Sequence, residues 1–296
     1  MMMRKLAGLA LAFLTFSPLA HAATPLPVIA SFSILGDIVA TVGGDRVQVT
    51  TLVSPNGDAH VYQPTPRDVR AVSQAKVVFY NGLGFEGWMT RLIQAAKFRG
   101  AQVTVSAGIT PQVMDEDGKQ INDPHAWQNP QNVRRYVSNI AAALEKADPA
   151  GAAEYRQRAQ AFDQQLLELD QWAHRQIAQI PPEKRRVITS HDAFDYFAKH
   201  YTIEFLAPQG MNTESEASAR DVARLIQQIK REHIHALFVE NISNRKLLDQ
   251  IAQETGVRVG PPLYSDALSA ANGPANTYLR MFQYNVTTLV AGMKLN

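Results

Sequence analysis

Short runs of β-branched residues alternate with helix-like segments along this chain, and the alternation constrains the fold more than any other feature. In the first half the strand-like runs are residues 28–32, 47–53, 77–80 and 103–105, with helix-like segments at 34–42, 66–74 and 86–96. Strands separated by single helices form right-handed βαβ units in which the strands run parallel. Residues 23–149 are therefore predicted to form an α/β lobe.

The same alternation returns near the C-terminus. The strand-like runs there are residues 187–189, 203–206, 236–239 and 257–259, and the helix-like segments are 192–200, 219–233 and 244–255. Residues 181–296 are therefore predicted to form a second α/β lobe. Between the halves, the polar segment 111–123 is expected to be a loop that flanks the functional site.

One long helix is predicted to join the lobes. Residues 150–180 have no Pro and no Gly after Gly151, space apolar side chains such as Phe162, Leu166 and Leu169 at helical intervals, and end at Pro181. About thirty residues at about 1.5 Å each give a helix of about 45 Å, longer than one small lobe needs. The predicted fold class is α/β, with two lobes, each a parallel β-sheet flanked by helices, joined by this backbone helix.

The N-terminus has the pattern of an export signal. Arg4 and Lys5 precede an apolar run over residues 6–16, and Ala20 and Ala22 are the small residues that a signal peptidase reads. Residues 1–22 are predicted to be a signal peptide, because the run is too short for a permanent membrane span. An uncleaved anchor is the alternative.

The overall composition narrows the function and the compartment. The 29 basic and 27 acidic residues give a formal charge of +2, which disfavours nucleic acid as a partner. The chain contains no cysteine, so neither disulfides nor a bacterial lipid anchor is expected. The sequence predicts a soluble monomer in the periplasm, with no membrane anchor.

Four residues form a candidate metal centre. His60, His125, His191 and Asp266 follow predicted strands or precede helices, two in each half, and ligands of open α/β sheets bind at the carboxyl ends of the strands. Taken singly, each is more often structural. Together, three imidazoles and one carboxylate suit a first-row divalent ion, and three nitrogens favour Zn²⁺. Four protein ligands leave no position for a reactive water, so an enzyme is not expected.

Metal-bound imidazoles usually donate their second nitrogen to a carboxylate or carbonyl, so outer partners are expected. Glu240, at the end of the strand-like run 236–239, is the first candidate, although a charge at a helix N-terminus explains it equally well. Asp58, Asp123 and Asn129 are further candidates because they lie near ligands in sequence.

The other histidines are predicted to lie outside the site. His233 and His235 precede their strand and so fall at the opposite sheet edge. His174, within the long helix, and His200, near a helix end, are interpreted as structural.

Four motifs carry a resemblance to a known family. Residues 57–64 (GDAHVYQP), 123–127 (DPHAW), 191–194 (HDAF) and 264–268 (YSDAL) resemble the ligand motifs of the zinc and manganese solute-binding receptors of bacterial ABC importers. The resemblance covers nearly the whole chain after the signal. It implies two α/β lobes on a backbone helix, and a receptor that delivers a metal to a membrane permease.

The resemblance also bears on the metal. The third ligand is commonly His in zinc-type receptors and Glu in manganese-type ones, so His191 implies Zn²⁺, with Mn²⁺ or iron as the alternative. This chain departs from the family at Gln128-Asn129-Pro130, where an Asp-Pro is usual, and segment 111–123 lacks the His-rich loop of many zinc receptors. A metal-binding adhesin, a zinc hydrolase and a receptor for an organic solute are the other readings, and no His-Glu-x-x-His run supports the hydrolase.

Overall fold

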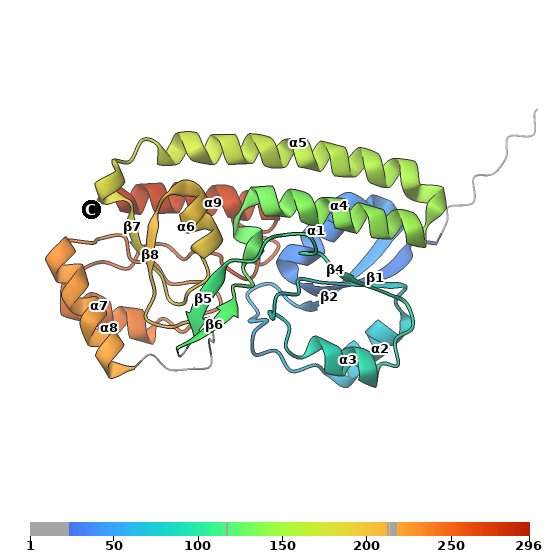
Figure 1. The fold of residues 1–296 in the computed structure, drawn as a ribbon, viewed down its shortest axis with the longest axis horizontal. Coiled ribbons are helices and arrows are strands. Elements are labelled where there is room, and N and C mark those ends of the chain that lie inside the picture. The colour runs from blue at the N-terminus through green and yellow to red at the C-terminus, as the bar shows by residue number, and fades with distance from the viewer. Residues whose placement is uncertain (1–23, 117, 212, 214–217) are drawn as a thin grey trace, which may run out of the picture.

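A computed structural model of the chain describes residues 24–116, 118–211, 213 and 218–296. The predicted signal peptide, residues 1–22, lies outside them. Two α/β halves lie side by side beneath one long helix, α5 (Ala152–Ile177), which runs along the top of both in Figure 1. None of the described helices is long and apolar enough to cross a membrane.

The N-terminal half is built on a four-stranded parallel sheet in the order β2-β1-β3-β4. Its strands are β1 (Leu26–Phe32), β2 (Val47–Val53), β3 (Val77–Tyr80) and β4 (Ala101–Thr104). Its crossover helices are α1 (Ser33–Gly43), α2 (Pro66–Gln74) and α3 (Met89–Ala95). Helix α2 begins where the sequence predicts, because Thr65 and Asp68 form a capping box and Pro66 occupies the first turn.

Helix α5 connects the halves. Helix α4 (Pro130–Ala147), capped by Asn129, precedes it in the first half, and a 3-10 turn over Pro149–Gly151 separates the two helices. The 26 residues of α5 correspond to about 39 Å. The helix packs on α1 and α4 of the first half and on α9 (Tyr278–Met293) of the second. The predicted lobe boundaries at residues 149/150 and 180/181 lie just outside α5 and stay predictions.

The C-terminal half is also α/β, but its sheet is fragmentary. Strands β7 (Arg186–Ile188) and β8 (Glu204–Leu206) pair in parallel. The expected strands 236–239 and 257–259 appear only as single parallel bridges from Leu237 to Ile188 and to Val259. Pro261 and Pro262, which follow Gly260, have no backbone N–H to extend a ladder. The helices around these strands are α6 (Asp195–Tyr201), α7 (Ala219–Glu232) and α8 (Lys246–Thr255).

Two local predictions are wrong. Segment 111–123 is not a loop throughout, since β5 (Val113–Glu116) and β6 (Lys119–Asn122) form an antiparallel hairpin. The Asp-Gly dipeptide at 117–118 is a hairpin signal that the polar composition obscures, and Gly118 has a φ of 77°. Helix α6 starts at Asp195 rather than 192, because His191 still forms a parallel bridge with Gln209.

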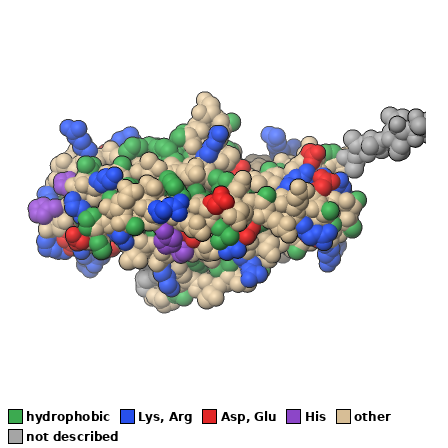
Figure 2. Space-filling model, turned by 90° about the horizontal axis from the view of Figure 1, so that it is seen from above, with side chains coloured by type: hydrophobic (Ala, Val, Ile, Leu, Met, Phe, Trp, Pro, Cys, Tyr) green, Lys and Arg blue, Asp and Glu red, His purple; other side chains and the backbone are tan. Residues whose placement is uncertain are grey.

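The hydrophobic core is continuous across the halves. One cluster runs from Ile29 in β1 through Leu166 in α5 to Phe282 in α9, and a smaller one around Ile229 and Ile251 lies beneath α7 and α8. The two halves are thus joined by apolar packing on the α5 side. On that face, basic side chains are scattered among acidic and uncharged ones and form no single patch (Figure 2).

Candidate metal centre

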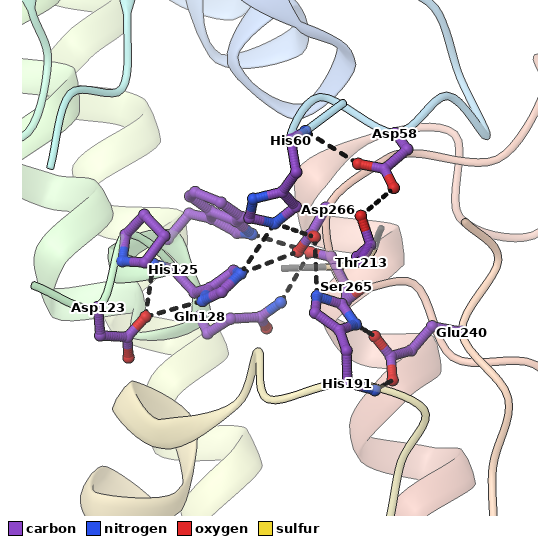
Figure 3. Close-up of polar contacts among 12 residues, drawn as sticks. Asp58, His60, Asp123, His125, Gln128, His191, Thr213, Glu240, Ser265 and Asp266 are labelled. Carbon is purple, nitrogen blue, oxygen red and sulfur yellow. Dashed lines mark hydrogen bonds and ion pairs between the residues drawn. The ribbon is translucent and has the colours of Figure 1, made fainter. Parts of the chain in front are cut away.

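The structure brings the four candidate residues together between the two halves. One ligand atom each from His60, His125, His191 and Asp266 lies within 4.8 Å of all the others (Figure 3). His60 comes from the loop after β2, His125 from the turn before α4, His191 from the segment after β7, and Asp266 from the loop before α9. Strand ends far apart in sequence thus converge on one buried point.

The spacing of these atoms suits a single small cation. The Oδ2 atom of Asp266 lies 3.1 Å from Nε2 of His60 and 3.1 Å from Nε2 of His191. The Nε2 atoms of His60 and His125 are 3.3 Å apart. Ligands at about 2.0–2.2 Å from a tetrahedral ion lie roughly 3.3 Å from one another, so these atoms need to move only slightly.

Carboxylates hold two of the imidazoles from behind. Nδ1 of His125 lies 2.7 Å from Oδ1 of Asp123, and Nδ1 of His191 forms an ion pair with Glu240. Glu240 also accepts the backbone N–H groups of Ser190 at 2.7 Å and of His191 at 3.1 Å. An Nδ1 that donates to a carboxylate leaves the Nε2 lone pair free, and in both rings Nε2 is the atom that faces the centre.

His60 is held differently. Asp58, a candidate partner, accepts the backbone N–H of His60 at 2.9 Å rather than an atom of its ring, and also the hydroxyl of Thr213 at 2.7 Å. The ring of His60 stands edge-on against Phe85, with centroids 4.7 Å apart. Asn129 accepts the N–H of Gln131 as the cap of α4, a role that explains it without the metal centre.

The Asp266 loop is held by hydrogen bonds from side chains that the sequence did not assign to this role. The carbonyl of Ser265 accepts from Trp127 Nε1 at 2.9 Å and from Gln128 Nε2 at 2.8 Å, so the segment that carries His125 is tied to the segment that carries Asp266. The side chain of Asn285 in α9 accepts the backbone N–H of Tyr264 at 3.0 Å and donates to its carbonyl at 2.7 Å. Gln128 can donate its bond to the Ser265 carbonyl because its side chain is an amide. Asn285 is detectable only as a polar residue within an apolar helix.

In the four ligand residues, burial disfavours the charged form and neighbouring opposite charges favour it, so the two effects oppose each other in each pKa. Burial lowers the pKa of His60. It opposes the charged form of His191 too, but Glu240 and Asp266 outweigh it and raise the pKa of His191 well above its ordinary value. The pKa of His125 is raised because Asp266 and Asp123 outweigh burial in the same way. Burial would raise the pKa of Asp266, yet the neighbouring imidazoles hold it well below its usual range.

The donor set fits a divalent cation. Oδ1 of Asp266 is buried without a hydrogen-bond partner among the described residues, 3.8 Å from His125 Nε2. A buried carboxylate oxygen left unpaired is costly unless a cation satisfies it. Three carboxylates within or behind the cluster, those of Asp123, Glu240 and Asp266, make the centre favourable for positive charge.

The remaining histidines divide into two groups. His233 and His235 are exposed, and His233 ends α7 with a φ of 52°, at the edge of the sheet opposite the centre. His174 and His200, interpreted from sequence as structural, lie together with Asp170 in a second cluster that has metal-ligand spacing.

The fold and this buried quartet define the class of two-lobed receptors that bind a metal ion. Residues 28–292 match the family described as the periplasmic component A of zinc-uptake complexes, ZnuA, and the chain belongs to that family. Its members are substrate-binding receptors of ABC metal transporters, not enzymes.

Relatives with different metals are about equally similar. The manganese-binding lipoprotein MntA of Halalkalibacterium halodurans is 35% identical over 90% of this chain and 88% of its own length. The iron-binding protein YfeA of Yersinia pestis is 34% identical over 90% of this chain and 85% of its own. The structure of the periplasmic zinc-binding protein TroA of Treponema pallidum superposes with a TM-score of 0.85 at 31% identity, over 91% of this chain and 99% of that one. The family and the metal-receptor function follow from these matches, and the choice of metal does not.

Proposed function

We propose that this receptor holds one Zn²⁺ ion as cargo with His60, His125, His191 and Asp266 and passes it to the permease of an ABC importer. The observation that carries the proposal is the convergence of three Nε2 atoms and one carboxylate on a buried point, with ligand atoms within 4.8 Å. The Nδ1 atoms of His125 and His191 each pair with a carboxylate, an arrangement that commonly orients metal-bound imidazoles.

The kinds of donor atom in the quartet favour zinc. Three imidazole nitrogens and one carboxylate oxygen form a closed tetrahedral set, whereas Mn²⁺ favours more oxygen ligands. One observation favours the alternative, Mn²⁺ or iron. Oδ1 of Asp266 is unpaired, so Asp266 can supply both oxygens and raise the coordination number.

The test is the metal content and affinity of untagged protein. We expect one tightly bound Zn²⁺ per chain, measured by titration calorimetry and elemental analysis, and loss of this event in His191→Ala. His235→Ala removes an exposed imidazole outside the quartet and should bind like the wild type. Full zinc affinity in His191→Ala would refute the ligand assignment, and tighter binding of Mn²⁺ than of Zn²⁺ would refute the choice of metal.

The cellular setting is part of the proposal. We propose export to the periplasm as a monomer without a lipid anchor, since the printed sequence contains no cysteine, whereas the relative MntA is named a lipoprotein. Cell fractionation should find the mature protein in the soluble periplasmic fraction. Recovery with the membrane fraction after a high-salt wash would contradict this.

A further inference from the structure

A second cluster of metal-ligating side chains lies where α5 meets α6. Asp170 and His174 stand one turn apart on α5, and His200 lies in the last turn of α6. One ligand atom from each of the three lies within 4.8 Å of the other two. We call Asp170, His174 and His200 the α5–α6 trio. Histidine side chains are open to solvent near the middle of the α5 face in Figure 2.

The carboxylate of the trio is already fixed in place. Oδ1 of Asp170 accepts from Tyr201 at 2.7 Å and lies 2.7 Å from Nε2 of His200. Its Oδ2 accepts from Gln131 of α4 at 2.6 Å. These partners hold the pKa of Asp170 at about 2 even though burial would raise it, so no proton on the carboxylate competes with a cation.

The imidazoles have room to adjust. The side chain of His174 is 50% exposed, its Nε2 lies 3.8 Å from Oδ1 of Asp170, and its ring meets that of His200 edge-on at 5.0 Å. A metal between His200 and Asp170 would widen their 2.7 Å contact by roughly 0.5 Å, given metal–ligand distances of about 2.0–2.2 Å. The exposed side of the trio leaves the remaining coordination positions to water.

We propose that the α5–α6 trio is a second divalent-metal site, separate from the buried quartet, which binds Zn²⁺, Ni²⁺ or Cu²⁺ weakly and links α5 to α6. Two imidazoles and one carboxylate prefer these ions to Mn²⁺ in the general affinity order. Binding is weaker than at the quartet because one ligand fewer is present and the site is open to water. The trio shares no residue with the quartet, so the proposal does not rest on the proposed function.

The experiment is calorimetric titration of metal-free, untagged protein with Zn²⁺, and separately with Mn²⁺. The wild type should show a tight and a weak zinc event, two ions in all, with no weak event for Mn²⁺. His174→Ala should lose the weak event alone, His191→Ala should keep it, and His235→Ala, a matched exposed imidazole, should behave as wild type.

Folding of the variants is checked by circular dichroism, and His174→Gln serves as a second, more conservative replacement. A single zinc event in the wild type would overturn the proposal. So would a weak event that persists with the same affinity in both His174 variants, because the ion would then lie elsewhere. If His191→Ala kept the tight event and His174→Ala lost the weak one, the quartet assignment would fail and the trio would stand.

Discussion

The molecule holds two clusters of nearly the same ligand chemistry in opposite settings. In the quartet, the side chains of His125, His191 and Asp266 are 0% exposed. In the α5–α6 trio, His174 is 50% exposed and His200 is 23% exposed. The side chains are of the same kinds, so the difference lies in burial, ligand number and support from behind.

The two clusters differ most clearly in the hydrogen-bond partners that orient their ligand side chains. In the quartet, Asp123 and Glu240 hold Nδ1 of two ligand histidines, so that Nε2 is the free nitrogen. In the trio, the hydrogen bonds from Tyr201 and Gln131 orient the carboxylate and not the rings. A binding site whose ligands are held in place loses less conformational entropy when the ion arrives. Preorganised imidazoles therefore explain why we assign the tight site to the quartet.

The largest expected effect comes from removing the charge at the centre of the quartet. Asp266→Asn takes away the carboxylate that faces His60 and His191, and we expect zinc affinity of the tight event to fall by more than about 100-fold, beyond the loss typical of an outer partner. The weak event at the trio should be unchanged. Calorimetry measures both events. Equal losses of affinity at the two clusters would show that they are not separate zinc sites.

A smaller effect is expected from the support behind His191. Glu240→Gln keeps the shape but removes the charge that pairs with Nδ1, and we expect a loss of about 10–100-fold in affinity. Glu204→Gln is the control, since Glu204 pairs with Arg186 at the surface of the same half. If the two variants bound zinc equally well, support by Glu240 would be irrelevant to the tight site.

The smallest effect is expected from a change of one pH unit. In the metal-free centre the pKa of His191 is raised, so this group adds stability to the metal-free protein below about pH 6.5, and that stability is lost as pH rises through the raised value. Zn²⁺ must displace the proton, so affinity should rise with pH by up to about tenfold per unit for one proton. The increase in melting temperature produced by zinc should be larger at pH 8 than at pH 6. An equal increase at both values would contradict the raised pKa of His191.

The N-terminal half was the more predictable part of the fold. Its strands contain short β-branched pairs, such as Val28-Ile29 and Val77-Val78, and α2 is marked by Thr65, Pro66 and Asp68, which are all local signals. The strands expected after residue 235 are reduced to single bridges, and Pro261 and Pro262, which have no backbone N–H, interrupt the pairing between the bridges at Val259 and Leu263. Helix α9 was not assigned from sequence, although Thr277 caps it and apolar residues line it.

The two clusters also differ in what sequence could reveal. Each quartet residue stands in a distinctive motif near a strand end or a turn, so the candidates could be named before the structure was known. The trio joins a residue inside a long helix to one on α6, 26 positions later, from His174 to His200. Only the packing of α5 on α6 brings them together, and helix periodicity contains no information about that contact.

The most direct test of the quartet is X-ray absorption at the zinc edge of protein loaded with one equivalent of Zn²⁺. We expect a four-coordinate shell of nitrogen and oxygen at about 2.0–2.1 Å with scattering from three imidazoles, and we expect His191→Ala to lose this three-imidazole signal. A shell with fewer than three imidazoles, or a spectrum unchanged by His191→Ala, would contradict the quartet assignment.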